Sequence, residues 1–204
     1  MPKHKKNDLL YHGSKIQGLS ILKPNISDFE RVLVYATESD IFPAIFINNP
    51  GGSFEAAWGK SSHGIPFYCE RVPNVFERNY SKCVGSIYSL EKKYFYKMEN
   101  LWEEEFVSDK EVPILKEMEI SNVQDYLLKK QKLGKFIFIP FEYRFKYFPT
   151  IDEDLIQNSI ECVKRFGEEN VFSQLRIHHP QALIDEVQSR LKKLNITNDE
   201  KLIR

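Results

Sequence analysis

The sequence predicts an α+β fold, in which a strongly curved and mostly antiparallel sheet carries attached helices and is followed by a helical C-terminal appendage. Residues 67–148 contain aromatic and β-branched runs that alternate with polar residues, which is typical of strands. From residue 151 onward, apolar residues recur at helical spacing. Aromatic residues make up 13% of the chain, which is too much for a chain that stays disordered. We therefore expect an α+β domain over residues 1–148 and a helical extension over residues 149–204 packed on the same domain.

The first part of the chain, residues 8–47, predicts a strand, a turn, a second strand and a short helix. The apolar run 9–11 begins the first strand, and the compact β-branched run 32–36 is typical of a buried strand. Residues 37–40 carry helix-capping side chains, and the apolar residues 44–47 form the expected packed face of the helix.

Residues 48–66 hold four of the nine glycines and predict a long loop around a short helical turn at 54–58. A loop of this length inside a compact domain is usually a lid or a binding loop.

The aromatic-rich segment predicts several strands and one helix. Apolar residues at helical spacing predict the helix at 122–132. Residues 141–148 alternate aromatic and basic side chains, which fits either a strand with one buried aromatic face or a surface that stacks nucleobases. The expected strands are 83–90, 94–98, 105–108, 114–120 and 136–139.

Two helices are expected in the C-terminal extension. Asp152 and Asp154 are alternative caps for the first, which ends at Gly167, a residue typical of a helix C-cap. Pro180 lies where a proline is tolerated in the first turn of the second helix.

Charge and cysteine content limit the classes of protein. Lys and Arg together number 29, as do Asp and Glu, which disfavours a dedicated nucleic-acid binder. The three cysteines form no CxxC pair and show no zinc-ligand spacing, so we expect reduced thiols, a cytoplasmic protein and no metal site. No run approaches the roughly 18 apolar residues that a spanning helix needs, so no membrane is expected as a partner.

Three short motifs combine residue types that suit polar recognition. In residues 11–14 (YHGS), an imidazole lies beside a glycine and a hydroxyl; the alternative is a structural histidine at a turn. In residues 34–37 (VYAT), a tyrosine at a strand end suits a planar ligand, and the alternative is a core tyrosine. Residues 103–108 (EEEFVS) offer a carboxylate for general-base work, against the alternative of a solvated acidic turn.

In this order, YHGS, VYAT and EFVS resemble the ADP-ribosyltransferase superfamily. The resemblance is to the diphtheria-toxin-like or poly(ADP-ribose) polymerase-like branch, which has a His-Tyr-Glu triad, and to its bacterial members. It implies a split sheet of the ADP-ribosyltransferase type. It also implies that NAD is a substrate, whose ADP-ribose passes to an unidentified acceptor (a protein, a nucleic acid or a small molecule) with release of nicotinamide.

The resemblance also implies roles for individual residues. His12 would bond the ribose next to adenine, and Tyr35 would stack on the nicotinamide ring. Glu105, with Glu104 as the second choice, would bond the other ribose and steer the acceptor. The implied catalytic residues are His12, Tyr35 and Glu105; the implied cofactor-binding residues are His12, Gly13, Ser14, Tyr35 and Thr37.

Other interpretations stay open. A non-catalytic module on the same fold could bind NAD, ADP-ribose or a nucleotide, and a partner-binding domain could lack a nucleotide site. For the NAD pyrophosphate, location alone suggests Lys15, Lys23 or the loop amides at Gly51–Gly52 as donors.

Overall fold

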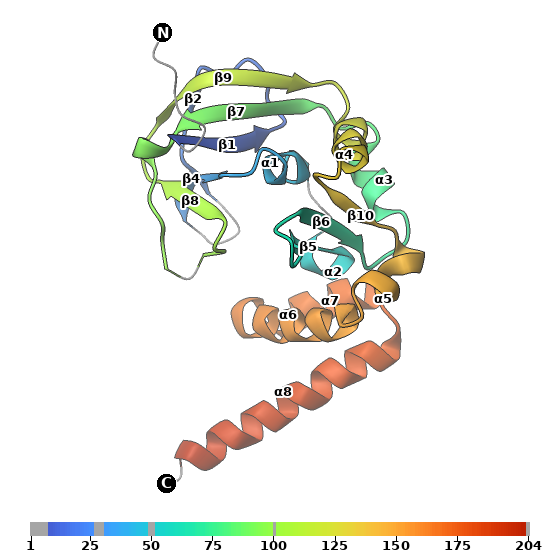
Figure 1. The fold of residues 1–204 in the computed structure, drawn as a ribbon. Coiled ribbons are helices and arrows are strands. Elements are labelled where there is room, and N and C mark those ends of the chain that lie inside the picture. Colours follow the sequence, from blue (N-terminus) through green and yellow to red (C-terminus); the bar gives the residue numbers. More distant parts are fainter. Residues whose placement is uncertain (1–7, 27–30, 49–51, 100, 203–204) are drawn as a thin grey trace. The chain divides into compact units, whose positions relative to one another are not determined.

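The computed structural model describes residues 8–26, 31–48, 52–99 and 101–202, and Figure 1 shows its mixed α and β content. The chain forms two compact units. Unit 1 contains residues 1–50 and 76–136, and unit 2 contains residues 51–75 and 137–204. These units do not follow the expected boundary at residue 148, because residues 51–75 and 137–148 belong to the unit that holds the C-terminal helices.

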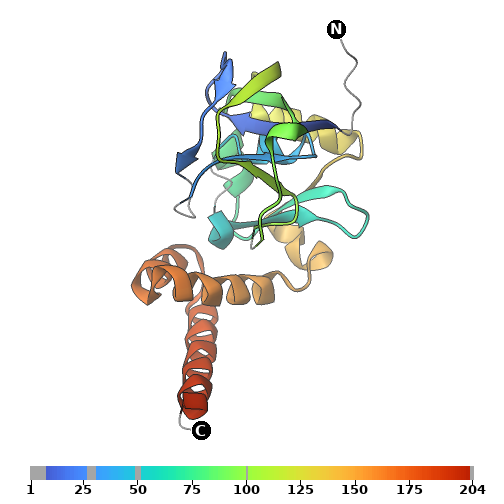
Figure 2. The ribbon, with the colours of Figure 1, turned by 90° about the vertical axis from the view of Figure 1, so that its left-hand side faces the viewer.

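Unit 1 is built on a curled antiparallel sheet of seven strands (Figures 1 and 2). The strand order is β2-β9-β7-β1-β4-β3, and β8 pairs with β4 beside this path. Every pairing in this sheet is antiparallel. The strands are β1 (Leu9–Ser14), β2 (Ile21–Leu22), β3 (Asn25–Ile26), β4 (Val32–Thr37), β7 (Gly85–Glu91), β8 (Glu105–Ser108) and β9 (Val112–Ile120).

An apolar cluster covers one face of this sheet, because strand side chains alternate between the two faces. Its buried members are Leu10, Leu22, Val34, Ala36, Tyr88, Leu90, Phe106 and Val112.

Helix α1 (Phe42–Ile45) contacts the sheet at β1, β4 and β7. At Gly13 the approach is so close that an added Cβ would lie 2.1 Å from the carbonyl oxygen of Pro43. Only glycine fits such a contact, so Gly13 fixes how α1 lies on β1.

Two further helices belong mainly to unit 1. Helix α4 (Val123–Lys132) begins at Asn122, whose side chain accepts a hydrogen bond of 3.0 Å from the backbone N–H of Asp125. Helix α3 (Val75–Tyr80) packs the rings of Phe76 and Tyr80 5.1 Å apart.

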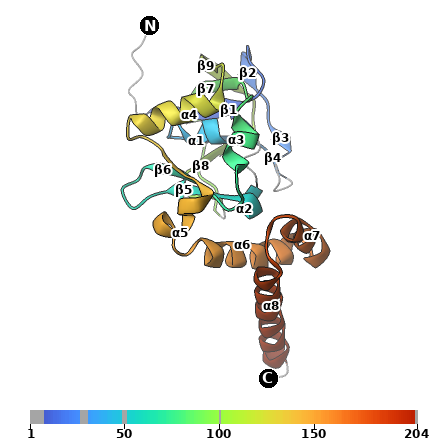
Figure 3. The same cartoon turned by 90° about the vertical axis from the view of Figure 1, so that its right-hand side faces the viewer.

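Unit 2 joins a three-stranded sheet to a set of helices (Figure 3). The sheet has the order β10-β6-β5, with strands β5 (Ala56–Lys60), β6 (Pro66–Glu70) and β10 (Ile137–Ile139). The helices are α2 (Gly52–Glu55), α5 (Arg144–Tyr147), α6 (Ile151–Phe166), α7 (Glu168–His178) and α8 (Gln181–Leu202).

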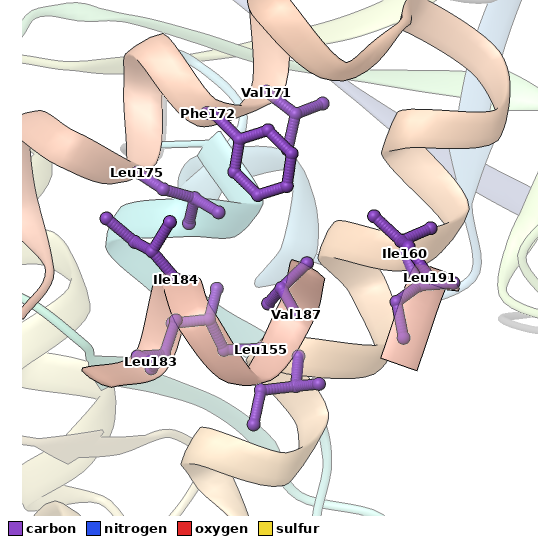
Figure 4. Packing of buried hydrophobic residues seen from close by; sticks show 10 residues of the cluster. Leu155, Ile160, Val171, Phe172, Leu175, Leu183, Ile184, Val187 and Leu191 are labelled. Atoms are coloured by element: carbon purple, nitrogen blue, oxygen red, sulfur yellow. The ribbon is translucent and has the colours of Figure 1, made fainter. Parts of the chain in front are cut away.

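Helices α6, α7 and α8 enclose an apolar cluster of unit 2. Figure 4 shows Ile160 of α6, Leu175 of α7 and Val187 of α8 among its members. Leu175 and Val187 are completely buried. Burial of apolar side chains from all three helices is therefore what holds them together.

Polar contacts connect these helices to the rest of unit 2. The buried guanidinium of Arg71 donates a hydrogen bond to the carboxylate of Asp154 on α6. The Glu70 carboxylate accepts a hydrogen bond of 3.1 Å from the backbone N–H of Phe141. His179 Nε2 lies 2.6 Å from the carbonyl oxygen of Phe54.

Several sequence predictions are confirmed. Strand β8 covers the expected residues 105–108, and α4 begins after Asn122 as expected. Helix α6 ends at Gly167, whose φ of 83° lies in the left-handed region that favours glycine.

The expected long loop at 48–66 is wrong, because residues 56–60 form strand β5. Gly59 favoured a loop, yet this glycine lies opposite Phe67 in the sheet, and a Cβ would come within 3.3 Å of the Phe67 ring. Residues 49–51 lie outside the described part of the chain.

Three further expectations are corrected. Residues 94–98 form no strand; a 3-10 helix covers Lys92–Tyr94, and Tyr96 makes an isolated bridge to Val107. Residues 141–148 are helical rather than a strand with a buried aromatic face, and their Tyr147 is 60% exposed. Helix α7 precedes Pro180 and was not expected.

Candidate functional site

Three neighbouring strands of unit 1 carry the residues that the sequence singled out. Thr37 of β4 lies opposite Tyr11 of β1 and also opposite Glu105 of β8. Tyr35 lies opposite Val107 of β8. Figure 1 shows β1, β4 and β8 as neighbouring strands. The register brings His12, Tyr35 and Glu105 within two residues of the paired positions Tyr11, Thr37 and Glu105 on these strands.

The side chain of His12 crosses the gap where β1 and β4 separate. Among the described residues, Tyr11 and Thr37 are the one register pair between these strands. Beyond that pair, His12 Nδ1 lies 2.7 Å from the backbone carbonyl oxygen of Tyr35. The imidazole thus links β1 to the backbone of β4 next to their register pair.

This hydrogen bond determines which nitrogen of His12 carries the proton. A carbonyl oxygen only accepts, so Nδ1–H is the donor to Tyr35 and the lone pair is on Nε2. Burial lowers the pKa of His12, and the hydrogen bond to Tyr35 opposes that shift only in part. At neutral pH the ring is therefore uncharged, and it offers a hydrogen-bond acceptor at Nε2.

Glu105 is a half-buried carboxylate at the start of β8. Burial raises its pKa, while a hydrogen bond from the backbone N–H of Trp102 and the charge of Lys97 oppose the shift. Glu103, two residues earlier, is exposed. A carboxylate whose pKa is shifted by burial, next to candidate ligand-binding residues, is typical of a functional site.

Tyr35, Thr37 and Glu105 lie on one face of the β4–β8 pair, because residues opposite each other or two apart share a face. Tyr35 is half-buried, and Thr37 is buried and donates its hydroxyl to the carbonyl of Ser39 at 2.9 Å. The hydroxyl of Thr37 is therefore engaged within its own turn.

Strand alternation places His12 differently from its two expected partners. On β1, His12 follows Leu10 toward the face of the apolar cluster, whereas Tyr11 and Gly13 face the side covered by α1. Glu105 shares the face of Tyr11. The three side chains thus do not lie on one face, and a ligand that touches all of them would lie across the open edge between β1 and β4.

The remaining candidates have structural partners. Gly13 packs against Pro43, as described above, and the Ser14 hydroxyl accepts a hydrogen bond of 3.0 Å from the backbone N–H of Ile16. Lys23 forms an exposed ion pair with Glu111 at 3.3 Å. Lys15 lines a cavity in unit 1, and Gly51 lies outside the described residues.

Sequence reasoning missed two features around these strands. Trp102 contacts both Glu105 and the ring of Phe42 on α1, with ring centroids 4.6 Å apart. Asn48 and Asn79 also line the cavity at Lys15. No motif joins these residues, because they are far apart in the sequence and only the fold brings them together.

Within the ranges that the structure covers, no group of three or more His, Cys, Asp or Glu side chains is placed to hold a metal ion. The cysteines Cys69, Cys83 and Cys162 are free thiols. No helix in the described part of the chain is both long and apolar enough to cross a bilayer. In comparisons with known proteins, the chain matches no family model, no curated protein and no solved structure.

Proposed function

We propose that this protein is an NAD-utilising, ADP-ribosyltransferase-like enzyme that transfers ADP-ribose to an acceptor and releases nicotinamide. The observation that carries the proposal is the contact between the His12 imidazole and the Tyr35 carbonyl, one strand away from the half-buried Glu105. The order of the three motifs and the antiparallel curled sheet support it. The ADP-ribosyltransferase type of the fold and a cytoplasmic location belong to the same proposal.

The chemistry of the two polar side chains fits NAD. Nε2 of His12 accepts a hydrogen bond from a hydroxyl, and each ribose of NAD carries hydroxyl donors. Cleavage of the bond between ribose and nicotinamide develops positive charge on the ribose, as in glycoside hydrolysis. An ionised Glu105 near that ribose would stabilise the charge, since a carboxylate in a partly dry site acts more strongly than one in water.

Titration with NAD, read for both binding and free nicotinamide, tests the proposal. We expect the native protein to release nicotinamide, and Glu105→Gln to lower the rate by about 10²–10³-fold while it still binds NAD. Glu103→Gln is the matched control, because it removes the same charge from a neighbouring residue that is exposed. An equal loss of nicotinamide release in both variants, or no loss in either, would contradict the role of Glu105.

A second candidate is a non-catalytic module that binds NAD, ADP-ribose or another nucleotide at this edge. It is favoured by the register, which places His12 on one face and Tyr35 with Glu105 on the other. NAD binding by the native protein without any nicotinamide release would support this module. A partner-binding domain without a nucleotide site predicts no thermal shift with millimolar NAD, whereas a ligand at 100 times its dissociation constant adds about 2.7 kcal/mol to the unfolding free energy.

The acceptor is the open part of this proposal. Proteins, nucleic acids and small molecules all carry suitable nucleophiles, and the zero net charge disfavours nucleic acid. Incubation with labelled NAD and each class of acceptor separately would identify the class. The native protein should label only the true acceptor, and Glu105→Gln should not label it.

A further inference from the structure

A cavity of about 330 Å³ lies in unit 1 next to the end of β1. Three cationic side chains, Lys15, Arg78 and Lys82, line it, and no acidic side chain does so among the described residues. The three come from different segments: Lys15 directly follows β1, and the other two flank the end of α3. The fold therefore gathers three positive charges from distant parts of the sequence around one hollow.

The charges of Lys15 and Lys82 are not neutralised locally. Within the described ranges, neither lysine forms an ion pair with a carboxylate. The Lys15 ammonium is close enough to the thiol of Cys83, another lining residue, to lower its pKa against the stronger effect of burial. Lys15 thus extends toward the cavity wall.

Two amide side chains complete the lining. Asn48 donates a hydrogen bond of 2.5 Å from Nδ2 to the backbone carbonyl of Asn79, which fixes it against the end of α3. Nδ2 of Asn79 is buried and has no hydrogen-bond partner among the described residues. A buried donor without an acceptor is unfavourable, and Asn79 also lines the cavity, so a ligand oxygen that reached this amide would relieve that cost.

We propose that this cavity binds the phosphate group of a phosphorylated small molecule. Lysine and arginine side chains recognise phosphate oxygens through charge-assisted hydrogen bonds, and amide N–H groups add further donors. The cavity is larger than the volume of a single phosphate group. It falls at the lower end of the range for small-molecule pockets, which have volumes of roughly 300–1,000 Å³. The ligand therefore carries an organic part beside its phosphate.

The cavity is distinct from the edge at which His12 lies. The residues that line the cavity begin with Lys15, after the end of β1, and they include none of His12, Tyr35 and Glu105. Gly85, opposite the end of β1, would place a Cβ 2.6 Å from Ile47, the residue before Asn48. The inference does not rest on the proposed NAD chemistry, because it uses only residues of this cavity.

Calorimetric titration with inorganic pyrophosphate tests the inference. We expect saturable binding by the native protein. In Lys15→Glu and in Lys82→Glu the dissociation constant should be at least tenfold higher. Lys135→Glu is the matched control, since this lysine is exposed, lies in the same unit and is absent from the lining. Its affinity should stay within about twofold of the native value. Urea unfolding of each variant verifies that it is folded.

A second titration separates the cavity from the proposed NAD site. Saturating NAD should leave pyrophosphate affinity unchanged, and so should His12→Ala. Failure of pyrophosphate to bind at millimolar concentration would overturn the inference. Release of one bound pyrophosphate for each NAD that binds would overturn the inference too, because the cavity would then be one end of the NAD site. Loss of nicotinamide release in any experiment bears on the proposed function alone.

Discussion

The two units place their polar side chains in different ways. In unit 2, Arg71 bonds Asp154 and Glu70 bonds the backbone of Phe141, so polar contacts join one structural element to another around an apolar cluster. In unit 1, burial shifts the pKa of both His12 and Glu105 against the charged form. Burial also acts against the charged form of Arg71 in unit 2, but there the Asp154 carboxylate opposes it. For Glu105 in unit 1, burial outweighs both the backbone N–H of Trp102 and the charge of Lys97, so its charged form lowers stability.

The two tryptophans allow this comparison to be tested separately in each unit. Trp58 lies in β5 of unit 2, and Trp102 precedes β8 in unit 1. Trp102→Phe leaves only the reporter of unit 2, and Trp58→Phe leaves only that of unit 1.

The largest effect is expected from Leu175→Ala in the cluster of unit 2. Leu175 is completely buried, so its truncation should lower the free energy of unfolding by about 2–5 kcal/mol. Urea unfolding followed by Trp58 fluorescence in the Trp102→Phe background measures it. Ile177→Ala on the same helix is the control, because Ile177 is 64% exposed and its change should stay within about 0.5 kcal/mol. Similar losses in both variants would refute a stability role specific to the cluster.

A smaller effect is expected from Gly13→Ala in unit 1. The added methyl group would overlap the Pro43 carbonyl, and the shift of α1 away from β1 should cost about 1–3 kcal/mol. Trp102 fluorescence in the Trp58→Phe background reports it. Ser14→Ala on the same strand removes only an exposed hydrogen bond and should cost less than about 1 kcal/mol. A stable Gly13→Ala protein would show that α1 does not hold this position.

The smallest effect is a gain of stability at neutral pH in Glu105→Gln. Burial raises the folded-state pKa of Glu105 above 4.5, so between 4.5 and that raised value the folded state binds more protons than the unfolded state. Stability that Glu105 provides in acid is therefore lost as the pH rises through this window. We expect Glu105→Gln to unfold at higher urea than the parent at pH 7, and the difference to disappear below pH 4.5. Glu103→Gln should show no such pH dependence, and a Glu105→Gln protein less stable than the parent at pH 7 would contradict the expectation.

Local sequence signals predicted the elements that depend on a few neighbouring residues. Helix α4 lies where helical spacing placed it, since its buried Val123 and Leu127 are four residues apart, and strand β8 lies at the short apolar run of Phe106 and Val107. Gly167 correctly predicted the end of α6, since its left-handed conformation is a local property.

Elements that depend on distant residues were missed. Gly59 suggests a turn in isolation, and only the ring of Phe67 on the facing strand explains a glycine inside β5. The same limit applies to the candidate site: His12, Tyr35 and Glu105 were chosen from the sequence, but the separation of β1 from β4 is a property of the assembled sheet. The faces that the side chains take follow from the register of the paired strands, and the hydrogen bond between the His12 side chain and the Tyr35 backbone is formed only in the assembled sheet.

The tautomer of His12 gives the edge between β1 and β4 a chemical preference. Because the main chain of Tyr35 already uses the only N–H of the neutral ring, Nε2 can accept a hydrogen bond but cannot donate one. A molecule that meets this nitrogen therefore forms a hydrogen bond with it through a donor such as a hydroxyl group, which an oxyanion does not have.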